Sequence, residues 1–391
     1  MNKSKYIHKS IKFIIIILFI FCLITMSTAN CSYAKGKFIE LNFIPETGNQ
    51  AILLNNNEVF FPGGWEKLNN KDMVPITAKI YKIKENKLVD LKSTMQIPRN
   101  GYYVVQLDNN NILVIGGFPY NNNHKQIVEK YNIESNKFTR VNKLETENFI
   151  IPKGVTLNDN RIFTVKGCQA QIFNPKKEEY YNVGLPHEVK TFLQFSSAGY
   201  GKEVNKNCYT NEFHLAPSLV GLKDGRVLIY DNYYSPVKND MVELFLPTSN
   251  SFTSIPLPKD IPLYETSIVL SNGKVLFIGG FENSGKVTIF DPNTNTFSKI
   301  TDLKPGFNGS QGIMLNNNKI LLLGGTISSD EIFGFNNKYL EYAIYDIVRN
   351  IIEKKKIHIG WGNRYSKQIF DIGSNRILIF ENKHKTKIYR Y

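Results

Sequence analysis

Short apolar strands recur along this chain at a fixed spacing. Seven times an apolar residue closes one strand, and a second strand ends ten positions later, after a few turn residues and an apolar run. The segments 275–280 (Val-Leu-Phe-Ile-Gly-Gly) and 320–325 (Ile-Leu-Leu-Leu-Gly-Gly) show the unit most clearly. The seven pairs of positions are Leu54/Gly64, Leu107/Gly117, Leu157/Gly167, Leu222/Asn232, Leu270/Gly280, Leu315/Gly325 and Ile372/Asn382. Such a regular repeat predicts a repeat architecture before local propensity is considered.

A second periodic signal follows each of these motifs. In the first six units a bulky apolar residue comes seven positions after an aromatic one, with turn sequences such as Asp291-Pro-Asn-Thr-Asn295 between them. Asn suits these turns because it tolerates left-handed backbone angles, and Pro presets the first turn dihedral. Each unit therefore predicts four strands. The recurring aromatic residues are Tyr81, Tyr131, Phe173, Phe245, Phe290, Tyr345 and Tyr389.

The repeat length and the absence of helical periodicity after residue 34 together predict the fold class. Four-stranded units of about 50 residues, repeated radially, are typical of a β-propeller. We therefore predict an all-β, seven-bladed propeller over residues 35–391.

The second unit resembles a kelch repeat. The resemblance rests on Arg99-Asn-Gly-Tyr-Tyr-Val-Val-Gln-Leu107, on Asn111-Ile-Leu-Val-Ile-Gly-Gly117, and on Glu129-Lys-Tyr131 through Phe138. It extends over the rest of the chain after residue 34, although the double glycine occurs in only four of the seven units and the usual tryptophan is replaced by Phe, Tyr, Leu or Ile. The resemblance implies a kelch-type propeller with the same kind of fold as galactose oxidase. It also implies that the protein is of the exported bacterial type.

The seventh unit indicates how the ring closes. The chain ends two residues after Tyr389, so this unit lacks a fourth strand. At the other end, Phe38-Ile-Glu-Leu41 has no partner strands of its own and matches the fourth-strand pattern of Phe138-Thr-Arg-Val141. We predict that the N-terminal strand completes the last blade, because closure removes the open edges of the ring.

The two faces of the predicted ring differ in their loops. The loops after strands 1 and 3 of a blade lie on one face, and here they are short polar turns. The loops of the opposite face contain the long insertions, which are 65–79, 118–128, 186–209, 233–241, 326–341 and 357–367. Long loops on one side of a rigid scaffold commonly carry recognition. These loops are rich in aromatic residues, which suit sugar faces and protein contacts, or pack as small local cores. They include Trp65, Phe118, Tyr120, Tyr200, Tyr209, Tyr233, Tyr234, Phe281, Phe333, Phe335, Trp361 and Tyr365.

The register of the inner strands selects candidate ligand-binding residues. Arg99 and Arg364 each lie eight residues before a strand-closing apolar residue. If the innermost strand of each blade continues back to these positions, both arginines lie at the mouth of the central channel on the long-loop face. A fixed guanidinium binds a carboxylate with two hydrogen bonds, and in kelch propellers that bind acidic ligands arginines at this location commonly do so. The alternative is an arginine that pairs with a neighbouring blade. Further candidates are Glu46, His214, Tyr264 and Glu265.

The first 34 residues have the pattern of a signal peptide. Four lysines precede a 14-residue apolar stretch, Phe13 to Met26, and Ser32-Tyr33-Ala34 supplies small residues at a cleavage site. The stretch is shorter than the roughly 20 residues that span a bilayer as a helix. Cleavage is favoured, with no membrane span left afterwards, and an uncleaved anchor stays open. We predict a secreted or cell-envelope protein.

Charge and cysteine content add to this picture. Cleavage would remove four lysines and lower the formal net charge from +14 to +10. The remaining positive charge either favours anionic surroundings or reflects a lysine-rich solvated surface. No like-charge block has the length of a nucleic-acid-binding tail, although 354–356 is a lysine cluster. Cys168 and Cys208 fall on the long-loop face of adjacent blades, so they either form a disulfide or stay as free thiols.

The sequence contains no recognisable catalytic motif, and we therefore favour a binding function. Kelch-type copper radical oxidases require two tyrosine and two histidine ligands, and no Tyr-His pair occurs here. We therefore expect no metal and no cofactor. The leading hypothesis is a monomeric propeller that recognises an extracellular glycan or an envelope protein and binds no nucleic acid. The alternatives are an enzyme acting on an acidic sugar, of the mutarotase or epimerase kind, a galactose-oxidase-like oxidase, and a purely structural repeat protein.

Overall fold

The computed structural model describes residues 36–41, 50–68, 72–119, 127–141, 153–166, 169–183, 192–193, 203–204, 218–230, 241–258, 266–279, 285–303, 310–316, 318–325, 338–359, 367–381 and 386–391. Every regular element in these ranges is a strand. None of their segments forms a helix long and apolar enough to cross a membrane.

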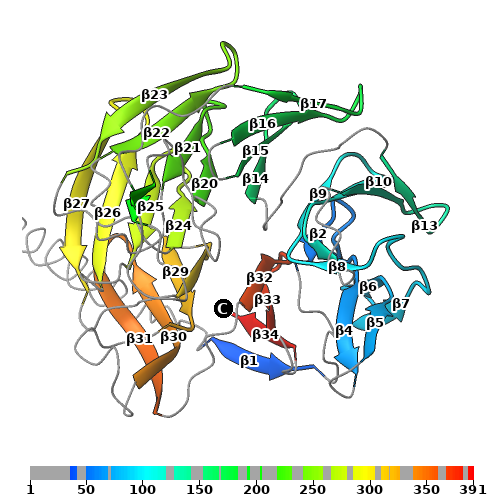
Figure 1. Ribbon diagram of the computed structural model, residues 1–391. Coiled ribbons are helices and arrows are strands. Elements are labelled where there is room, and N and C mark those ends of the chain that lie inside the picture. The colour runs from blue at the N-terminus through cyan, green and yellow to red at the C-terminus, as the bar shows by residue number, and fades with distance from the viewer. Residues whose placement is uncertain are drawn as a thin grey trace, which may run out of the picture.

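Seven four-stranded sheets form a ring of blades, as predicted (Figure 1). From the centre outwards, blades 1 to 4 consist of β2 (Ile52–Leu53), β3 (Glu58–Phe61), β6 (Lys79–Lys82), β7 (Lys87–Asp90); β9 (Tyr103–Gln106), β10 (Asn111–Ile115), β12 (Val128–Asn132), β13 (Lys137–Arg140); β14 (Lys153–Thr156), β15 (Ile162–Lys166), β16 (Gln169–Asn174), β17 (Glu179–Asn182); and β20 (Ser218–Gly221), β21 (Val227–Tyr230), β22 (Met241–Leu246), β23 (Ser251–Pro256).

Blades 5 to 7 follow the same order. They consist of β24 (Thr266–Val269), β25 (Val275–Ile278), β26 (Lys286–Asp291), β27 (Thr296–Asp302); β28 (Gln311–Met314), β29 (Lys319–Leu323), β30 (Lys338–Asp346), β31 (Ile351–Ile359); and β32 (Lys367–Asp371), β33 (Arg376–Glu381), β34 (Lys387–Arg390) and β1 (Lys37–Glu40). Three further pairs are β4 (Gly64–Leu68) with β5 (Asp72–Ile76), β8 (Arg99–Asn100) with β11 (Phe118–Pro119), and β18 (Phe192–Leu193) with β19 (Glu203–Val204).

The strand-closing apolar residue has the same backbone hydrogen bond in all seven blades. Its N–H donates to the carbonyl four residues later, as in Leu54 to Glu58 and Leu315 to Lys319, at 2.7–3.0 Å throughout. The turn between them uses a left-handed residue in six blades, for example Asn57 with φ 61° and Gly225 with φ 90°. The spacing seen in the sequence is therefore a repeated tight turn between strands 1 and 2.

The second turn of each blade explains the aromatic repeat. The residue five positions after the aromatic one has a positive φ in the first six blades, and it is Asn in five of them. Where the aromatic residue is Tyr, its hydroxyl donates to that Asn side chain, as between Tyr131 and Asn136 Oδ1 at 2.8 Å and between Tyr345 and Asn350 Oδ1 at 2.7 Å. Burial raises the pKa of Tyr131 and of Tyr345 to about 12, so these hydroxyls keep the proton that they donate.

The apolar core lies between the blades. Each of seven clusters contains side chains from two adjacent blades, and together they cover every interface around the ring. The cluster between blades 5 and 6, for example, joins Leu276 and Val287 to Ile320 and Tyr345. Because no sheet has a core of its own, each blade depends on both neighbours for burial of its faces.

The N-terminal strand completes blade 7, as predicted. β1 pairs antiparallel with β34, with Phe38 opposite Tyr389. The two ring centroids are 4.8 Å apart, which is also the separation of Tyr131 and Phe138 in blade 2. The N–H of Leu41 donates to the carbonyl of Thr386 at 2.8 Å, and Leu41 joins the cluster between blades 7 and 1.

Arginines on the short-turn face connect adjacent blades. Arg226 in blade 4 donates to the carbonyl of Pro292 at 2.5 Å and to Asn295 Oδ1 at 2.8 Å in blade 5, and Asp224 holds its guanidinium at 2.6 Å. Arg161 makes the equivalent contact from blade 3 to the carbonyl of Pro247 in blade 4.

We expect the substitution Arg226→Ala to lower the free energy of unfolding by about 1–2 kcal/mol, because charge-assisted hydrogen bonds between two blades are lost. Chemical denaturation measures the change. Lys177→Ala, an exposed turn variant, is the control and should stay within about 0.5 kcal/mol of the wild type. Equal stability of the two variants would contradict a clamp between blades.

Candidate functional site

Most of the predicted site residues lie outside the described ranges. Their roles therefore stay predictions, as does the disulfide. They are Glu46, His214, Tyr264, Glu265 and Arg364, and for the disulfide Cys168 and Cys208. Arg99 is described, together with its neighbours Asn100 and Tyr102 and the facing hairpin of blade 1.

The Arg99 side chain is fully buried within blade 2. Its Nε donates to the carbonyl of Gly116 at 2.7 Å, its Nη2 to the carbonyl of Val114 at 2.9 Å, and its Nη1 to the carbonyl of Ile97 at 2.9 Å. Nη1 also forms an ion pair with Glu129 Oε2, and both side chains have 0% exposure. The guanidinium therefore extends outward over strands 2 and 3 of its own blade.

The ion pair fixes the start of the blade. The second oxygen of Glu129, Oε1, accepts a hydrogen bond from the backbone N–H of Gln96 at 2.6 Å, so the segment before β8 is tied to strand 3. Burial lowers the pKa of the Arg99 guanidinium, whereas Glu129 acts to raise it. A guanidinium in this environment stays charged, and its hydrogen bonds stabilise the blade. The alternative interpretation of a paired arginine expected a partner in a neighbouring blade, whereas the partner Glu129 lies in the same blade.

The hairpin β4–β5 occupies the insertion 65–79 and is attached to blade 2. The Asn100 side chain accepts from the N–H of Trp65 at 3.0 Å and donates to the carbonyl of Trp65 at 3.0 Å. Nearby, the Tyr102 hydroxyl donates to the carbonyl of Gly63 at 2.7 Å. Tyr102 is fully buried, and this burial raises its pKa. Three side-chain hydrogen bonds therefore hold the base of the hairpin against the neighbouring blade.

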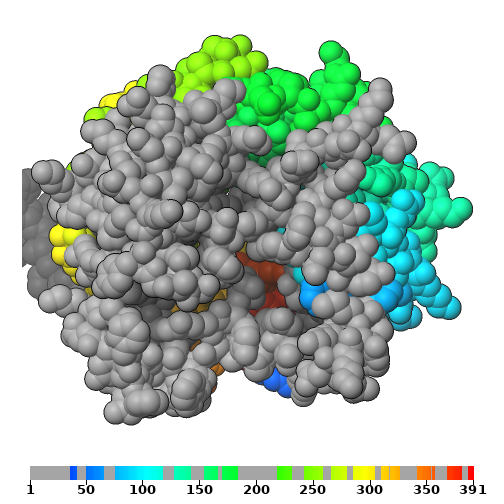
Figure 2. All heavy atoms as spheres, in the orientation of Figure 1, coloured from blue at the N-terminus to red at the C-terminus, as the bar shows by residue number. Residues whose placement is uncertain are grey.

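Among the aromatic residues predicted on the long-loop face, Trp65 is the one whose side chain lies in the described part of the chain. It is half-buried and lies opposite the exposed Pro75 in the hairpin. Figure 2 shows the described residues of blades 1 and 2 at the right of the ring in the orientation of Figure 1. The side chains of the other predicted aromatic residues of this face lie outside the described part of the chain.

Sequence reasoning missed Glu129, although a signal was present. Glu129 is two residues before Tyr131 in a strand, so both side chains point to the same face, and that face is buried. The same position holds a buried polar residue in three further blades: Gln171 before Phe173, Glu243 before Phe245 and Thr288 before Phe290. A polar residue two positions before a buried aromatic one, in the same strand, therefore indicates a polar side chain buried inside the blade.

No three His, Cys, Asp or Glu side chains come close enough to hold a metal ion within the described ranges. His124, His187, His214 and His384 lie outside them, and only the backbone of His358 is described.

Comparison with protein families finds the Kelch motif at residues 262–304. The match spans blade 5 from just before β24 to just after β27, one complete four-stranded unit. Together with the seven-bladed ring, it decides the type of repeat. The chain is a kelch-repeat β-propeller. Its other blades repeat the backbone hydrogen bond that closes the first strand.

Among solved structures, this kelch propeller is similar to a catalytically inactive virginiamycin B lyase from Staphylococcus aureus, crystallised with quinupristin. The TM-score is 0.53 and the sequence identity 10%, and the alignment covers 91% of this chain and 100% of the lyase chain. At this identity the likeness concerns the fold alone. A search of curated proteins finds no match.

A kelch propeller suggests a binding or scaffold role. The geometry agrees with such a role, because the ring is closed and one insertion on the long-loop face is fixed to the neighbouring blade.

Proposed function

We propose that this kelch propeller is a secreted or cell-envelope binding protein that recognises a glycan or a protein through its long-loop face. The proposal rests chiefly on the hairpin β4–β5 of that face, whose backbone at Trp65 is bonded to the side chain of Asn100. An aromatic residue on a backbone that is already held in place loses less conformational entropy on binding than one on an unrestrained loop. The signal-peptide pattern of residues 1–34 supports the extracellular location.

An indole ring suits both ligand classes. It offers a flat apolar face to a sugar ring or to an apolar side chain, and its N–H donates at the edge. Residues of this type dominate the energetics of many protein interfaces. The net positive charge of the chain adds a preference for acidic ligands, such as anionic envelope polymers.

The substitution Trp65→Ala is expected to weaken ligand binding by at least about tenfold, because truncation of a central aromatic contact typically costs more than about 1.4 kcal/mol. A glycan array and a titration with purified cell-envelope fragments provide the measurements. The melting temperature should change little, because the Asn100 hydrogen bonds go to the backbone of residue 65.

Tyr391→Ala is the matched control, because Tyr391 is also a half-buried aromatic residue and its N–H bonds to Asn375 in a turn of the opposite face. It should keep the wild-type affinity. Equal binding by wild type and Trp65→Ala would contradict a binding site at this hairpin, and saturable binding by neither would indicate a purely structural protein.

A further inference from the structure

The outer strands of blades 5 and 6 are longer than those of the other blades. β27 has seven residues and β31 has nine, whereas β1, β7, β13 and β17 have four each. Both are the outermost strands of their sheets. The outer edge of β31 therefore presents a long row of backbone groups that pair with no strand of the described sheets, and such an edge can accept an additional strand.

A groove lies between the ends of these two strands. It has a volume of about 410 Å³ and is lined by the last two residues of β27, by Leu303 after it, and by residues 350–353 and 355 of blade 6. The floor is apolar, because Leu303 is buried and Ile352 packs against the core cluster of blades 5 and 6. The rim is polar and includes Thr301 and Asn350.

One exposed apolar side chain lines this groove, and two more are close to lining residues in sequence. Three large hydrophobic side chains are exposed among the described residues: Ile300 at 37%, Ile351 at 45% and Val348 at 75%. Ile300 is the bulge residue of β27, since Val287 pairs with Thr301 and Thr288 with Lys299. Ile351 lines the groove itself. Ile300 directly precedes the lining residue Thr301, and Val348 is two residues before the lining residue Asn350. A groove with an apolar floor and exposed apolar residues in the segments that line it suits an apolar side chain of a partner.

The carboxylates near the groove are already neutralised. Glu353, the bulge residue of β31, pairs with Lys319 at 2.6 Å and with Arg349, and Asp302 pairs with Lys299 at 2.6 Å. Lys355 is exposed and lines the groove, and no carboxylate of the described residues forms an ion pair with it. The charge left at the groove is therefore positive.

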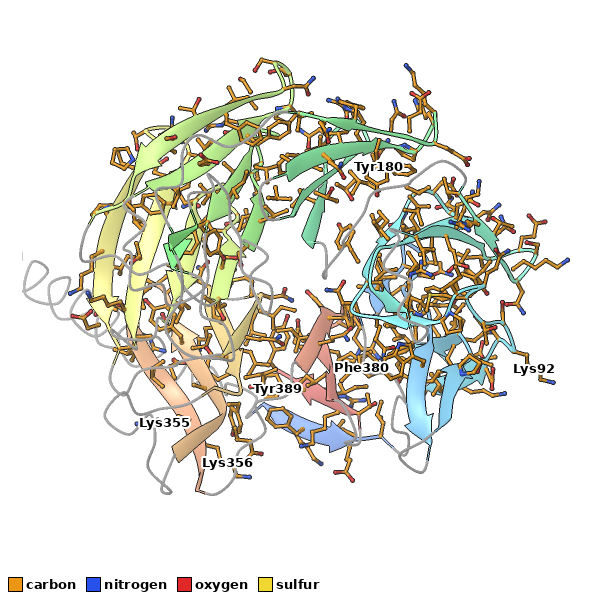
Figure 3. All side chains as sticks on the ribbon, viewed as in Figure 1. Lys92, Tyr180, Lys355, Lys356, Phe380 and Tyr389 are labelled. Carbon is orange, nitrogen blue, oxygen red and sulfur yellow. The ribbon has the colours of Figure 1, made fainter. Side chains whose placement is uncertain are left out.

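The adjacent lysines argue against a second copy of this chain as the occupant. A pairing of two β31 strands centred on the lysine cluster 354–356 would bring the two clusters together, and like charges directly opposite are destabilising. Figure 3 shows Lys355 and Lys356 at the outer rim of blade 6, away from the centre of the ring. Lys356 is 64% exposed and pairs with Glu341 of the neighbouring strand at 3.0 Å.

We propose that the outer edge of β31 is a docking site for an acidic, extended segment of a partner protein. The segment adds as a fifth strand to blade 6, inserts an apolar side chain into the groove beside Ile351, and places carboxylates near Lys355. The groove shares no residue with the hairpin β4–β5, so failure of either proposal leaves the other standing.

A short fluorescent peptide of alternating glutamate and valine is the probe. We expect saturable binding in fluorescence anisotropy, and about tenfold weaker binding to Ile351→Ser and to Lys355→Glu, which is typical for loss of one central contact. Both residues are exposed, so the fold should be retained. Lys92→Glu, an exposed lysine in another blade, is the control and should bind as the wild type does.

Two comparisons separate strand addition from simple charge attraction. The same peptide with alternate backbone nitrogens methylated keeps its charges and side chains but cannot pair along an edge, so it should not bind. Equal binding of the methylated peptide, of polyglutamate or of anionic lipid vesicles would overturn the proposal in favour of a general polyanion surface. Equal affinity of all three variants for the alternating peptide would overturn it as well.

Discussion

Replacing Arg99 with methionine is expected to lower the free energy of unfolding by about 3–5 kcal/mol, because it leaves the carboxylate of Glu129 buried without its partner. Both side chains have 0% exposure, and the guanidinium also bonds to three backbone carbonyls of its own blade. Denaturant titration of the purified protein measures the loss. The double variant Arg99→Met/Glu129→Gln should recover part of the stability, because it removes the uncompensated charge and keeps an acceptor for the N–H of Gln96.

Arg390→Met is the matched control for this experiment. Arg390 is an exposed arginine in β34 of blade 7, away from the Arg99–Glu129 pair, so its replacement should change stability by less than about 0.5 kcal/mol. The opposite pattern, near-normal stability of Arg99→Met with loss of an acidic ligand, would restore the sequence-based hypothesis of a ligand-binding arginine at the channel mouth.

Deleting residues 37–43 is expected to lower the melting temperature by roughly 5–10 °C. The deletion removes β1, exposes the paired edge of β34, and takes Phe38, Ile39 and Leu41 out of the clusters that blade 7 shares with its neighbours. Burial of each such side chain contributes about 1.5–3 kcal/mol, so the total loss is several kcal/mol. Differential scanning calorimetry measures the shift.

A chain that begins at Gly36 is the reference for this deletion, because it keeps the whole of β1. Adding a synthetic peptide of residues 36–43 to the truncated protein should restore part of the lost melting temperature. If the deletion melts within a degree or two of the reference, β1 does not close the ring in solution.

The repeat in the sequence predicted most of the fold, because each spacing reflects a backbone hydrogen bond. The step from Leu54 to Glu58 recurs in every blade, and the N-terminal strand was predicted from the match between Phe38 and Phe138. The hairpin β4–β5 was not predicted. Its alternating residues and central Asn69-Asn70 are a hairpin signal, but the four-strand template assigned the whole segment to a loop.

The orientation of Arg99 could not be predicted from the register. Counting eight residues back from Leu107 assumes one continuous inner strand, but Gly101, with φ 68°, separates β8 from β9. The alternation of side chains is therefore interrupted between Arg99 and Tyr103, and the guanidinium points into the blade. Its partner Glu129 is 30 positions away in sequence, a distance over which no local pattern connects the two.

The closure of blade 7 also has a kinetic consequence. β1 is the first strand of the propeller to be synthesised and β34 the last, so their contact has nearly the greatest sequence separation that this chain allows. Such long-range contacts form slowly, since the entropy of closing the loop must be overcome first. Ring closure should therefore be a late event in folding, and a chain that stops before β34 leaves β1 without a partner. The seventh blade thus makes the stability of the whole ring depend on synthesis of the chain through β34.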